Sequence, residues 1–139
     1  HCNRSNYMKQ LRIQRSKAAY DQAYSFLCFK KNSKELVGGI NISNIQRSVI
    51  QTCNIGYWLG EPHIKKGYME ESIRTIIPYI FGNLKINRIQ ALTLENNFSS
   101  RKLLEKIGFK NEGVLRKAMK INNIWEDHIL YALLNNDNS

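Results

Sequence analysis

The sequence contains few of the residues that cross-link a chain or bind metals. Its 139 residues include two prolines and three cysteines, and no two cysteines form a CxxC pair. An odd number of widely spaced cysteines argues against a disulfide framework, so we expect Cys28 and Cys53 to be free core thiols in a reducing cytoplasm. The three histidines are also far apart in the sequence, which predicts that the protein binds no metal.

Long apolar segments and acidic residues are scarce as well. The apolar runs, such as residues 76–81, are far shorter than the roughly 20 residues of a membrane span, and no secretory leader is visible. Eleven Asp and Glu stand against 21 Lys and Arg, which gives a net charge of +10. This excess suits an anionic partner such as nucleic acid, a ribosomal surface or a polyphosphate, and it is equally compatible with a solvated lysine-rich surface.

Length and composition predict one globular domain over residues 1–139. The chain begins at His1 rather than at a methionine, so we expect an N-terminal element to be missing from it. Residues 5–23 are rich in helix formers, and we expect a helix there. Three strand-like segments then follow in succession and predict an antiparallel meander: residues 24–29, 36–43 and 50–59. Within the second of these strands, Gly38 and Gly39 indicate a bulge or a close approach of two backbones.

The second half of the chain has a different pattern. Apolar residues recur at helical spacing from Gly67 to residue 83, and Pro78 should kink this helix by removing one backbone hydrogen bond. Residues 88–94 form the next strand, so the helix is a crossover and strands 50–59 and 88–94 should be parallel. The remaining elements are a short helix capped by Asn97 and ended by Gly108, and a hairpin of residues 109–120 and 124–133.

A strand, the basic loop of residues 60–66 and a helix N-terminus at Gly67 follow one another directly. Free backbone N–H groups and the positive end of a helix dipole meet at such a junction, which predicts a site for a phosphorylated ligand. Glu70 and Glu71 suit a helix start, but they would lie close to a bound phosphate. We therefore expect both carboxylates to point away from it.

Three blocks of sequence together resemble a known family. They are GYWLGEPHIKKGYMEES, ENNFSSRKLLEKIGFKNEG and VLRKAMKINNIWEDHILYALL, at residues 56–72, 95–113 and 114–134. They resemble the GNAT acetyltransferases, and specifically the branch that acetylates the N-termini of ribosomal proteins (ribosomal-protein alanine acetyltransferases). The resemblance implies an α+β, three-layer fold: a mixed, mostly antiparallel sheet with a central splayed pair of parallel strands and flanking helices. In the family this splay forms the cleft for acetyl-CoA.

The resemblance assigns the pyrophosphate loop of the family to residues 64–69, although only Gly67 of the glycine pattern is retained. Lys65 and Lys66 would compensate by pairing with the phosphates of acetyl-CoA. The alternative is a loop that only joins strand to helix. Gly56 would permit a bulge that exposes backbone groups to the cofactor. The residues expected to bind the cofactor are Tyr57, Trp58, Leu59, Ile64, Lys65, Lys66, Gly67, Tyr68, Met69, Asn97 and Ser100; alternation places Tyr57 and Trp58 on opposite faces of their strand.

Asn97 and Ser100 each have two interpretations. In the structural interpretation, Asn97 is an ordinary N-cap and Ser100 an ordinary first-turn residue. In the interpretation that the resemblance implies, Asn97 contacts the pantetheine arm and Ser100 protonates the departing thiolate as a general acid. The general base is less clear, because Met119 aligns with a glutamate of some relatives. Glu95 and the pair Glu126 and Asp127 are the candidates, and each is equally a surface carboxylate.

A weak base suffices for one class of acceptor. A lysine amine, with an ordinary pKa near 10.4, costs roughly 4 kcal/mol to neutralise at pH 7, whereas an α-amine costs only about 1 kcal/mol. Arg116, Trp125, Asp127 and His128 match residues of the branch. We expect Arg116, Trp125 and Asp127 to contact the substrate; the alternative is that these four residues only hold the last hairpin.

Three functions therefore remain open. The leading one is direct acetyl transfer from acetyl-CoA to the α-amine of a ribosomal protein N-terminus, without a metal, by a cytoplasmic monomer or dimer. The second is acetylation of a polyamine or other small amine, which requires an acidic cleft formed by carboxylates such as Glu35, Glu61, Glu95, Glu126 and Asp127. The third is a non-catalytic GNAT-like module that binds RNA or the ribosome. Nucleic acid would otherwise be contacted only through the ribosome, and no membrane is involved.

Overall fold

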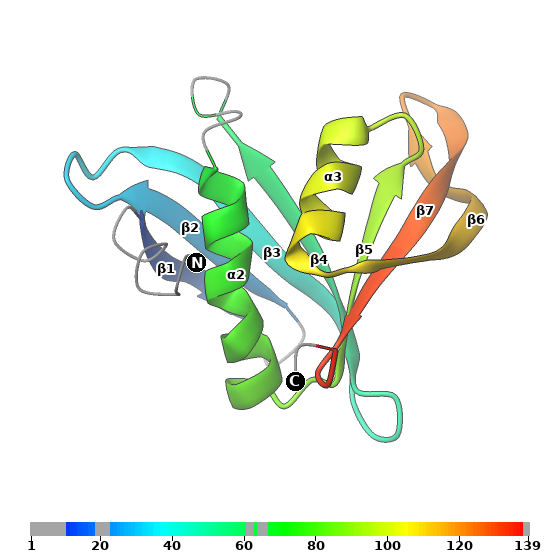
Figure 1. Cartoon of the computed structure of the whole chain (residues 1–139), viewed down its shortest axis with the longest axis horizontal. Coiled ribbons are helices and arrows are strands. Elements are labelled where there is room, and N and C mark those ends of the chain that lie inside the picture. The colour runs from blue at the N-terminus through cyan, green and yellow to red at the C-terminus, as the bar shows by residue number, and fades with distance from the viewer. Residues whose placement is uncertain (1–10, 19–22, 61–62, 64–66, 138–139) are drawn as a thin grey trace.

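The computed structural model describes residues 11–18, 23–60, 63 and 67–137 of the chain. These residues form one seven-stranded sheet in the order β1-β2-β3-β4-β5-β7-β6 (Figure 1). The elements in chain order are β1 (Leu11–Ala18), β2 (Tyr24–Lys30), β3 (Leu36–Gln46), β4 (Thr52–Leu59), α2 (Tyr68–Pro78), the π-helical turn η2 (Tyr79–Asn83), β5 (Arg88–Leu94), α3 (Phe98–Ile107), β6 (Lys110–Ile121) and β7 (Ile124–Leu134). None of the described helices is long and apolar enough to cross a membrane.

The helix expected over residues 5–23 is wrong where the structure describes this segment. Residues 11–18 are a strand, β1, which pairs antiparallel with β2. Leu11 is buried and Ile13 half-buried, whereas Arg12 and Gln14 between them are exposed. This period of two is the pattern of a strand with one buried face, and it outweighs the helix propensity of the individual residues.

The antiparallel meander of β2, β3 and β4 is confirmed, and so is the close approach at its glycines. Gly38 and Gly39 lie opposite Leu59 and Trp58 of β4. A Cβ atom at Gly38 would lie 2.2 Å from the carbonyl oxygen of Trp58, and one at Gly39 would lie 2.6 Å from the Trp58 Nε1 atom. Because the atom opposite Gly38 is backbone, only glycine at position 38 lets β3 and β4 pair at this distance, whereas a side chain at position 39 would have to displace the Trp58 ring.

The predicted parallel pair is also confirmed, and it is short. β4 and β5 pair only from Thr52 and Arg88 to Asn54 and Gln90. Beyond Asn54 the two strands diverge, which divides the sheet into two arms (Figure 1). The first arm consists of β1–β4 with α2, and the second consists of β5–β7 with α3.

Pro78 is the last residue of α2, and the chain continues as the π-helical turn η2. Proline has no N–H to donate, so it interrupts the α-helical ladder. The wider turn that follows is closed by the Leu84 N–H, which donates to the Tyr79 carbonyl over 3.0 Å.

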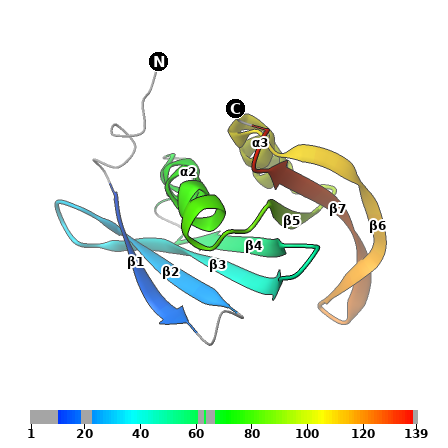
Figure 2. The same cartoon turned by 90° about the horizontal axis from the view of Figure 1, so that it is seen from below.

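Both helices lie on the same face of the sheet (Figure 2). The apolar face of α2 packs on the first arm and buries Met69, Ile73, Ile76 and Ile77. Helix α3 covers the second arm and buries Leu104 and Ile107. Cys28 and Cys53 are buried in the core as free thiols, as expected.

Candidate active site

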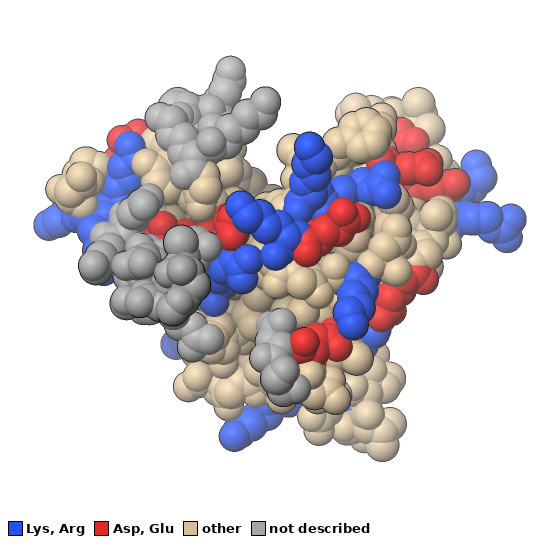
Figure 3. All heavy atoms as spheres, in the orientation of Figure 1, with Lys and Arg blue, Asp and Glu red and all other residues tan. Residues whose placement is uncertain are grey.

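The divergence of β4 and β5 opens a pocket of about 710 Å³ between the two arms. Segments that are far apart in the sequence line it: β4, the start of α2, the end of β5 and the first turns of α3. In Figure 3 the molecule is hollowed between the two helices, and Lys and Arg side chains gather there together with acidic ones.

Most of the residues expected to bind the cofactor come together here. Seven of those that the structure describes line this pocket, and Tyr68 is the exception: Tyr57, Trp58, Leu59, Gly67, Met69, Asn97 and Ser100. Ile64, Lys65 and Lys66 lie outside the described residues. Gly67 has a φ of 76° immediately before α2, and its position faces open space. Glycine adopts this left-handed conformation without strain, so Gly67 starts the helix and leaves its N-terminus open.

The bulge expected at Gly56 is wrong. The register between β3 and β4 is continuous from Asn54 to Leu59, and the irregularity lies instead between Ser43 and Gln46. No bulge is needed, because the divergence of β5 already leaves one edge of β4 unpaired beyond Asn54 among the described strands. A side chain at Gly56 would meet nothing within 4 Å, so this part of β4 faces the open pocket.

Tyr57 and Trp58 occupy opposite faces of β4, as alternation predicts. The Tyr57 hydroxyl lies on the helix face and is 2.5 Å from the Oγ atom of Ser100, at the start of α3. Trp58 lies beside Gly39 on the other face, and 45% of its surface is exposed. The pocket therefore extends from one face of the sheet to the other through the gap between the arms.

The Ser100 hydroxyl and the Tyr57 hydroxyl form a pair that can hold and move a proton. Burial raises the pKa of Tyr57, and this effect exceeds the opposing effect of its hydrogen bond with Ser100. Tyr57 is therefore protonated at neutral pH and can donate. Asn97 fixes the backbone beneath the pair, since its side-chain oxygen accepts a hydrogen bond from the Ser100 N–H over 3.3 Å. The cap and the chemical role of this segment are thus compatible.

Glu71 points away from the pocket, as expected. Its Oε2 atom accepts a hydrogen bond from the backbone N–H of Leu11 over 2.9 Å. The same expectation is wrong for Glu70, which lines the pocket. Its carboxylate pairs with Lys106 of α3 over 3.1 Å and with Arg74 over 3.0 Å. Burial alone would raise the pKa of Glu70, but the hydrogen bonds from Lys106 and Arg74 hold it below its ordinary value. The carboxylate is therefore ionised and neutralised by two cations.

Sequence reasoning missed two lysines of this pocket. Lys102 and Lys106 project into it from α3, on the same helical face as Ser99 and Leu103. The spacing of these four residues, i, i+3, i+4 and i+7, could have been read from the sequence once the helix was placed. The lysines add positive charge to the side of the pocket opposite the N-terminus of α2.

Thr93 of β5 was also missed, and it tests whether the pocket suits a polar ligand. Only 5% of Thr93 is exposed, yet its Oγ1 atom has no hydrogen-bond partner among the residues that the structure describes. Thr93 lines the same pocket. A buried hydroxyl without a partner is unfavourable, and a ligand with an amide or carbonyl group at this position would satisfy it. Together with the free edge of β4, this fits the polar pantetheine arm of acetyl-CoA.

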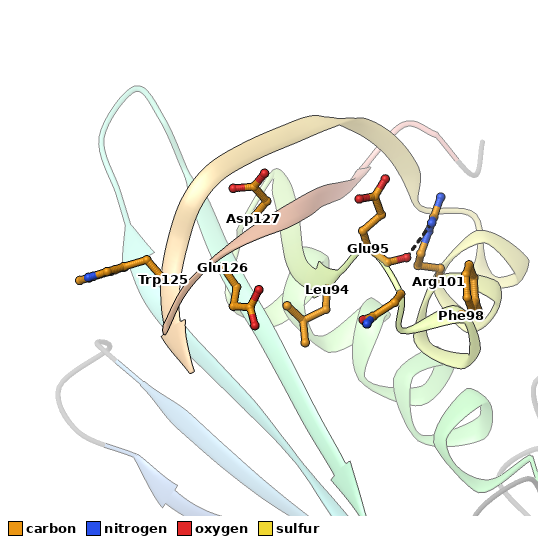
Figure 4. A pocket seen from close by; sticks show the side chains of 8 residues that line it. Leu94, Glu95, Phe98, Arg101, Trp125, Glu126 and Asp127 are labelled. Carbon is orange, nitrogen blue, oxygen red and sulfur yellow. Dashed lines mark hydrogen bonds between the residues drawn. The ribbon is translucent and has the colours of Figure 1, made fainter. Parts of the chain in front are cut away.

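A second pocket of about 660 Å³ adjoins the first at Leu94 (Figure 4). Glu95, Glu126 and Asp127 line it together with Phe98, Arg101 and Trp125. Arg101 donates to the backbone carbonyl of Glu95 over 2.8 Å, and this bond holds the chain that follows β5. Asp127 accepts a hydrogen bond from the Lys117 N–H over 2.8 Å, while Trp125 extends away from the other labelled side chains.

Three of the five carboxylates considered for an acidic cleft are thus gathered in the second pocket. Glu35 is elsewhere, paired with His63 over 3.0 Å and with Lys30 over 3.6 Å. Glu61 lies outside the described residues. Arg116 of β6, an expected substrate contact, lines neither of the two pockets.

Comparison with known proteins identifies the family. Residues 3–110 match the acetyltransferase (GNAT) domain model. The chain therefore belongs to the GNAT acetyltransferase family, whose members use acetyl-CoA, and the splayed mixed sheet is the fold of that family.

Relatives in this family carry more specific names. The chain is 42% identical to the probable N-acetyltransferase YjcK of Bacillus subtilis over 117 residues, 84% of this chain and 65% of that protein. It is 32% identical over 137 residues to the [ribosomal protein uS5]-alanine N-acetyltransferase of Escherichia coli, covering 99% of this chain and 71% of that protein. The structure superimposes on the ribosomal-protein-S5-alanine acetyltransferase of Vibrio fischeri with a TM-score of 0.80 and 33% identity, over 85% of this chain and 64% of that one. The chain thus spans about two thirds of the length of these relatives.

Proposed function

We propose that this protein is an acetyl-CoA-dependent N-acetyltransferase that transfers the acetyl group directly to an amine, with the α-amine of a ribosomal protein N-terminus as the favoured acceptor. One observation carries the proposal. Three segments that are distant in the sequence, around Tyr57, Gly67 and Ser100, line a single pocket where β4 and β5 diverge. The pocket offers positive groups at one end and two hydroxyl groups within it.

The residues of the pocket divide the binding of acetyl-CoA between them. The N-terminus of α2, opened by Gly67, binds the pyrophosphate, and Lys102 and Lys106 contribute positive charge from α3. We also assign Lys65 and Lys66 to the phosphates. The unpaired edge of β4 at Tyr57–Leu59 and the Asn97 side chain orient the pantetheine arm, in the way that a strand edge binds an extended peptide.

The thioester supplies an activated acetyl group, and residues of the protein donate and accept the protons that the reaction transfers. Ser100 donates a proton to the departing sulfur, and Tyr57, 2.5 Å away, replaces that proton. Because the pKa of Tyr57 is raised, the pair keeps its protons until the thiolate forms. The attacking amine enters from the second pocket, where Glu95 is the first carboxylate beyond β5.

The second pocket supports a positively charged acceptor. Its carboxylates, Glu95, Glu126 and Asp127, would attract a protonated amine, and Trp125 offers a surface for the residues that follow. We assign Asp127 and Trp125 to substrate contacts. A relative named as a ribosomal-protein alanine acetyltransferase supports a protein N-terminus, and therefore a cytoplasmic enzyme that works beside the ribosome.

The same three carboxylates also favour a second candidate, acetylation of a polyamine. The two acceptors are distinguished by comparing a peptide with N-terminal alanine against spermidine, with release of coenzyme A thiol as the signal. An α-amine substrate predicts the higher kcat/KM for the peptide. The reverse order would support the polyamine, and thiol release with neither acceptor would leave only a binding function.

Calorimetry with acetyl-CoA tests the cofactor assignment, with affinity expected between low micromolar and submillimolar. Replacement of Ser100 by alanine should lower turnover by about 10- to 100-fold while the affinity for acetyl-CoA changes less than about threefold. Ser99→Ala, at the neighbouring position of the same helix, is the matched control. Unchanged turnover in Ser100→Ala would remove this hydroxyl from the mechanism.

A further inference from the structure

We propose that His128 of β7 is the general base that accepts the proton lost by the attacking amine. This role rests on the proposed N-acetyltransferase function and adds the residue on the acceptor side of the reaction. His128 lines the pocket between the arms together with Ser100 and Tyr57. It is only 3% exposed, so the surrounding protein covers most of the residue and holds its ring in place.

The sheet places His128 on the side of the gap opposite to the hydroxyl pair. Tyr131 of the same strand points to the helix face, because its hydroxyl donates to Glu105 of α3. Side chains alternate along a strand, so His128, three residues before Tyr131, points to the other face. It pairs with Leu94, the residue at which the two pockets meet. The proton donors and His128 thus flank the gap from opposite faces.

A single hydrogen bond determines which tautomer the neutral ring adopts. The Nδ1 atom of His128 is 3.1 Å from the backbone carbonyl oxygen of Glu126. A carbonyl oxygen can only accept, so Nδ1 carries the hydrogen. In the neutral ring the lone pair then lies on Nε2, and no other hydrogen bond of His128 is present in the described part of the chain. The backbone thus orients a basic nitrogen that has no competing partner.

The other residues near the gap are less suited to this task. Glu95 lies beyond the end of β5 in the second pocket and is exposed. Met119 lines the first pocket but has no basic atom. Glu70 is already neutralised by Lys106 and Arg74. Among these residues, His128 is the one whose basic nitrogen is not already engaged by another group of the described structure.

The reaction balances with these groups. The lone pair of the neutral amine forms a bond to the thioester carbonyl carbon, and Nε2 of His128 takes one proton from that nitrogen. The C–S bond breaks, its electron pair goes to sulfur, and Ser100 supplies a proton to it. Solvent then removes the proton from His128 and restores the hydroxyl pair. The products are an acetamide and the free thiol of coenzyme A.

The charges around His128 come from several elements. Leu94 and Leu115 flank it on β5 and β6, and both are uncharged. The titratable and charged groups that share its pocket or its strand are Tyr57, Glu70, Lys102, Lys106, Glu126, Asp127 and Tyr131. Glu95 lies in the second pocket, beyond Leu94.

His128→Gln tests the assignment, because glutamine retains an N–H donor for the Glu126 carbonyl and removes the basic nitrogen. The expected result is a loss of about 100-fold in kcat/KM for an alanine-initiated peptide, with the affinity for acetyl-CoA within about threefold of the wild type. Glu95→Gln removes the competing carboxylate and should lower kcat/KM by much less than about 100-fold. Glu112→Gln, which removes a carboxylate of β6 that lines neither pocket and pairs with Arg88, is the matched control and should retain near wild-type activity. The dependence of log kcat/KM on pH should show two ionisations on its acidic limb in the wild type, the amine and His128, and only one in His128→Gln.

Three outcomes would overturn the assignment: a His128→Gln variant that matches the wild type, a Glu95→Gln variant that shows the 100-fold loss instead, or a wild-type pH profile with the amine ionisation alone. The last criterion holds even when His128→Gln does not fold. Failure of the proposed function looks different, because the wild type itself would then bind acetyl-CoA without releasing thiol to any amine.

Discussion

The two arms that flank the cleft are stabilised in different ways. In the first arm, α2 buries seven residues, and its isoleucines pack against the apolar strands β1–β4. In the second arm, α3 buries only Leu104 and Ile107, and polar groups connect it to the sheet. The Tyr131 hydroxyl donates to Glu105 over 2.6 Å and accepts from Arg101 over 3.2 Å.

This difference matters because each arm carries a different part of the site. The first arm holds the start of α2 and the free edge of β4, where the cofactor is expected to dock, and it contributes one chemical group, the Tyr57 hydroxyl. The second arm holds Ser100, Thr93 and His128, where the chemistry is expected to occur. Apolar packing is strong and non-directional, whereas a hydrogen-bond network fixes positions and is sensitive to the loss of one member. We therefore expect damage to the first arm to affect folding and damage to the second arm to affect turnover.

Truncation of the apolar core should give the largest effect. Ile73→Ala in α2 removes a fully buried side chain and should destabilise the protein by about 3–4 kcal/mol. Turnover per folded molecule should remain near that of the wild type. Denaturant unfolding and active-site titration measure the two quantities. Leu104→Ala in α3 is the counterpart, and it should lower turnover as well as stability. An equal loss of turnover in both variants would contradict the distinction between the arms.

One polar contact in the first arm, the hydrogen bond between Glu71 and Leu11, makes the stability of this arm depend on pH. Burial of Glu71 raises its pKa from 4.5 to about 7, although its hydrogen bond from Leu11 acts in the opposite direction. The folded protein therefore binds this proton more tightly than the unfolded chain does. The stabilisation is fully present below pH 4.5 and is lost as the pH rises through about 7.

Glu71→Gln should remove this pH dependence. The amide keeps an acceptor for the Leu11 N–H and carries no charge, so the variant should be more stable than the wild type at pH 8 by about 1–2 kcal/mol. At pH 4.5 the two proteins should have nearly the same free energy of unfolding. A constant difference across this range would show that Glu71 does not change its protonation with pH in the folded state.

In the second arm, Tyr131→Phe removes one hydroxyl and retains the ring. The change should cost about 1 kcal/mol of stability, because Glu105 and Arg101 are left to solvent. Turnover should fall more than affinity for acetyl-CoA, since α3 positions Ser100. Tyr79→Phe is the control in the first arm, where the ring packs edge-on against Phe26 at 5.6 Å. It should leave turnover unchanged, and a similar loss in Tyr79→Phe would refute the special role of the network in α3.

Much of this architecture could be predicted from the sequence because it follows from periodicity. The helical spacing after Gly67 and the strand at residues 88–94 required a parallel crossover, and the Asn97 cap with Gly108 bounded α3. The three sequence blocks at residues 56–72, 95–113 and 114–134 could be assigned to one cleft only through the family resemblance. Periodicity alone does not say where two parallel strands cease to pair.

The failures have physical causes. The helix formers in β1 led to the wrong prediction of a helix. Residues 11–18 form a strand because they pair with β2, and the helix propensity of single residues contains no information about such pairing. The bulge at Gly56 was unnecessary because the divergence of β5, a property of two strands together, already exposes the edge of β4. Glu70 was expected to point away from a bound phosphate, but it lines the pocket because Lys106 of α3 neutralises it there. The sequence could not show this pair, since its two members lie on different helices. Thr93 could not be recognised, since an unsatisfied hydroxyl is defined by what surrounds it.

Thr93 gives the smallest effect and the most direct test of the pocket. Its hydroxyl is buried without a partner in the described structure, so Thr93→Val should stabilise the unliganded protein by about 0.5–1 kcal/mol. The same change should weaken acetyl-CoA binding by about 3- to 10-fold, because the ligand loses a hydrogen bond. Thermal unfolding and calorimetry measure these opposite changes in one variant.

Thr52→Val is the matched control for this substitution. Thr52 is equally buried at the start of β4, but its Oγ1 atom donates to the Arg88 carbonyl over 3.2 Å in the paired part of the strands. Its replacement should therefore destabilise the protein by about 1 kcal/mol and leave acetyl-CoA affinity unchanged. If Thr93→Val raises the stability and Thr52→Val lowers it, the polar groups of the ligand bind where β4 and β5 have separated. If Thr93→Val lost stability without any change in affinity, its hydroxyl would have a partner within the protein, and the pocket would have to bind acetyl-CoA through β4 and α3 alone.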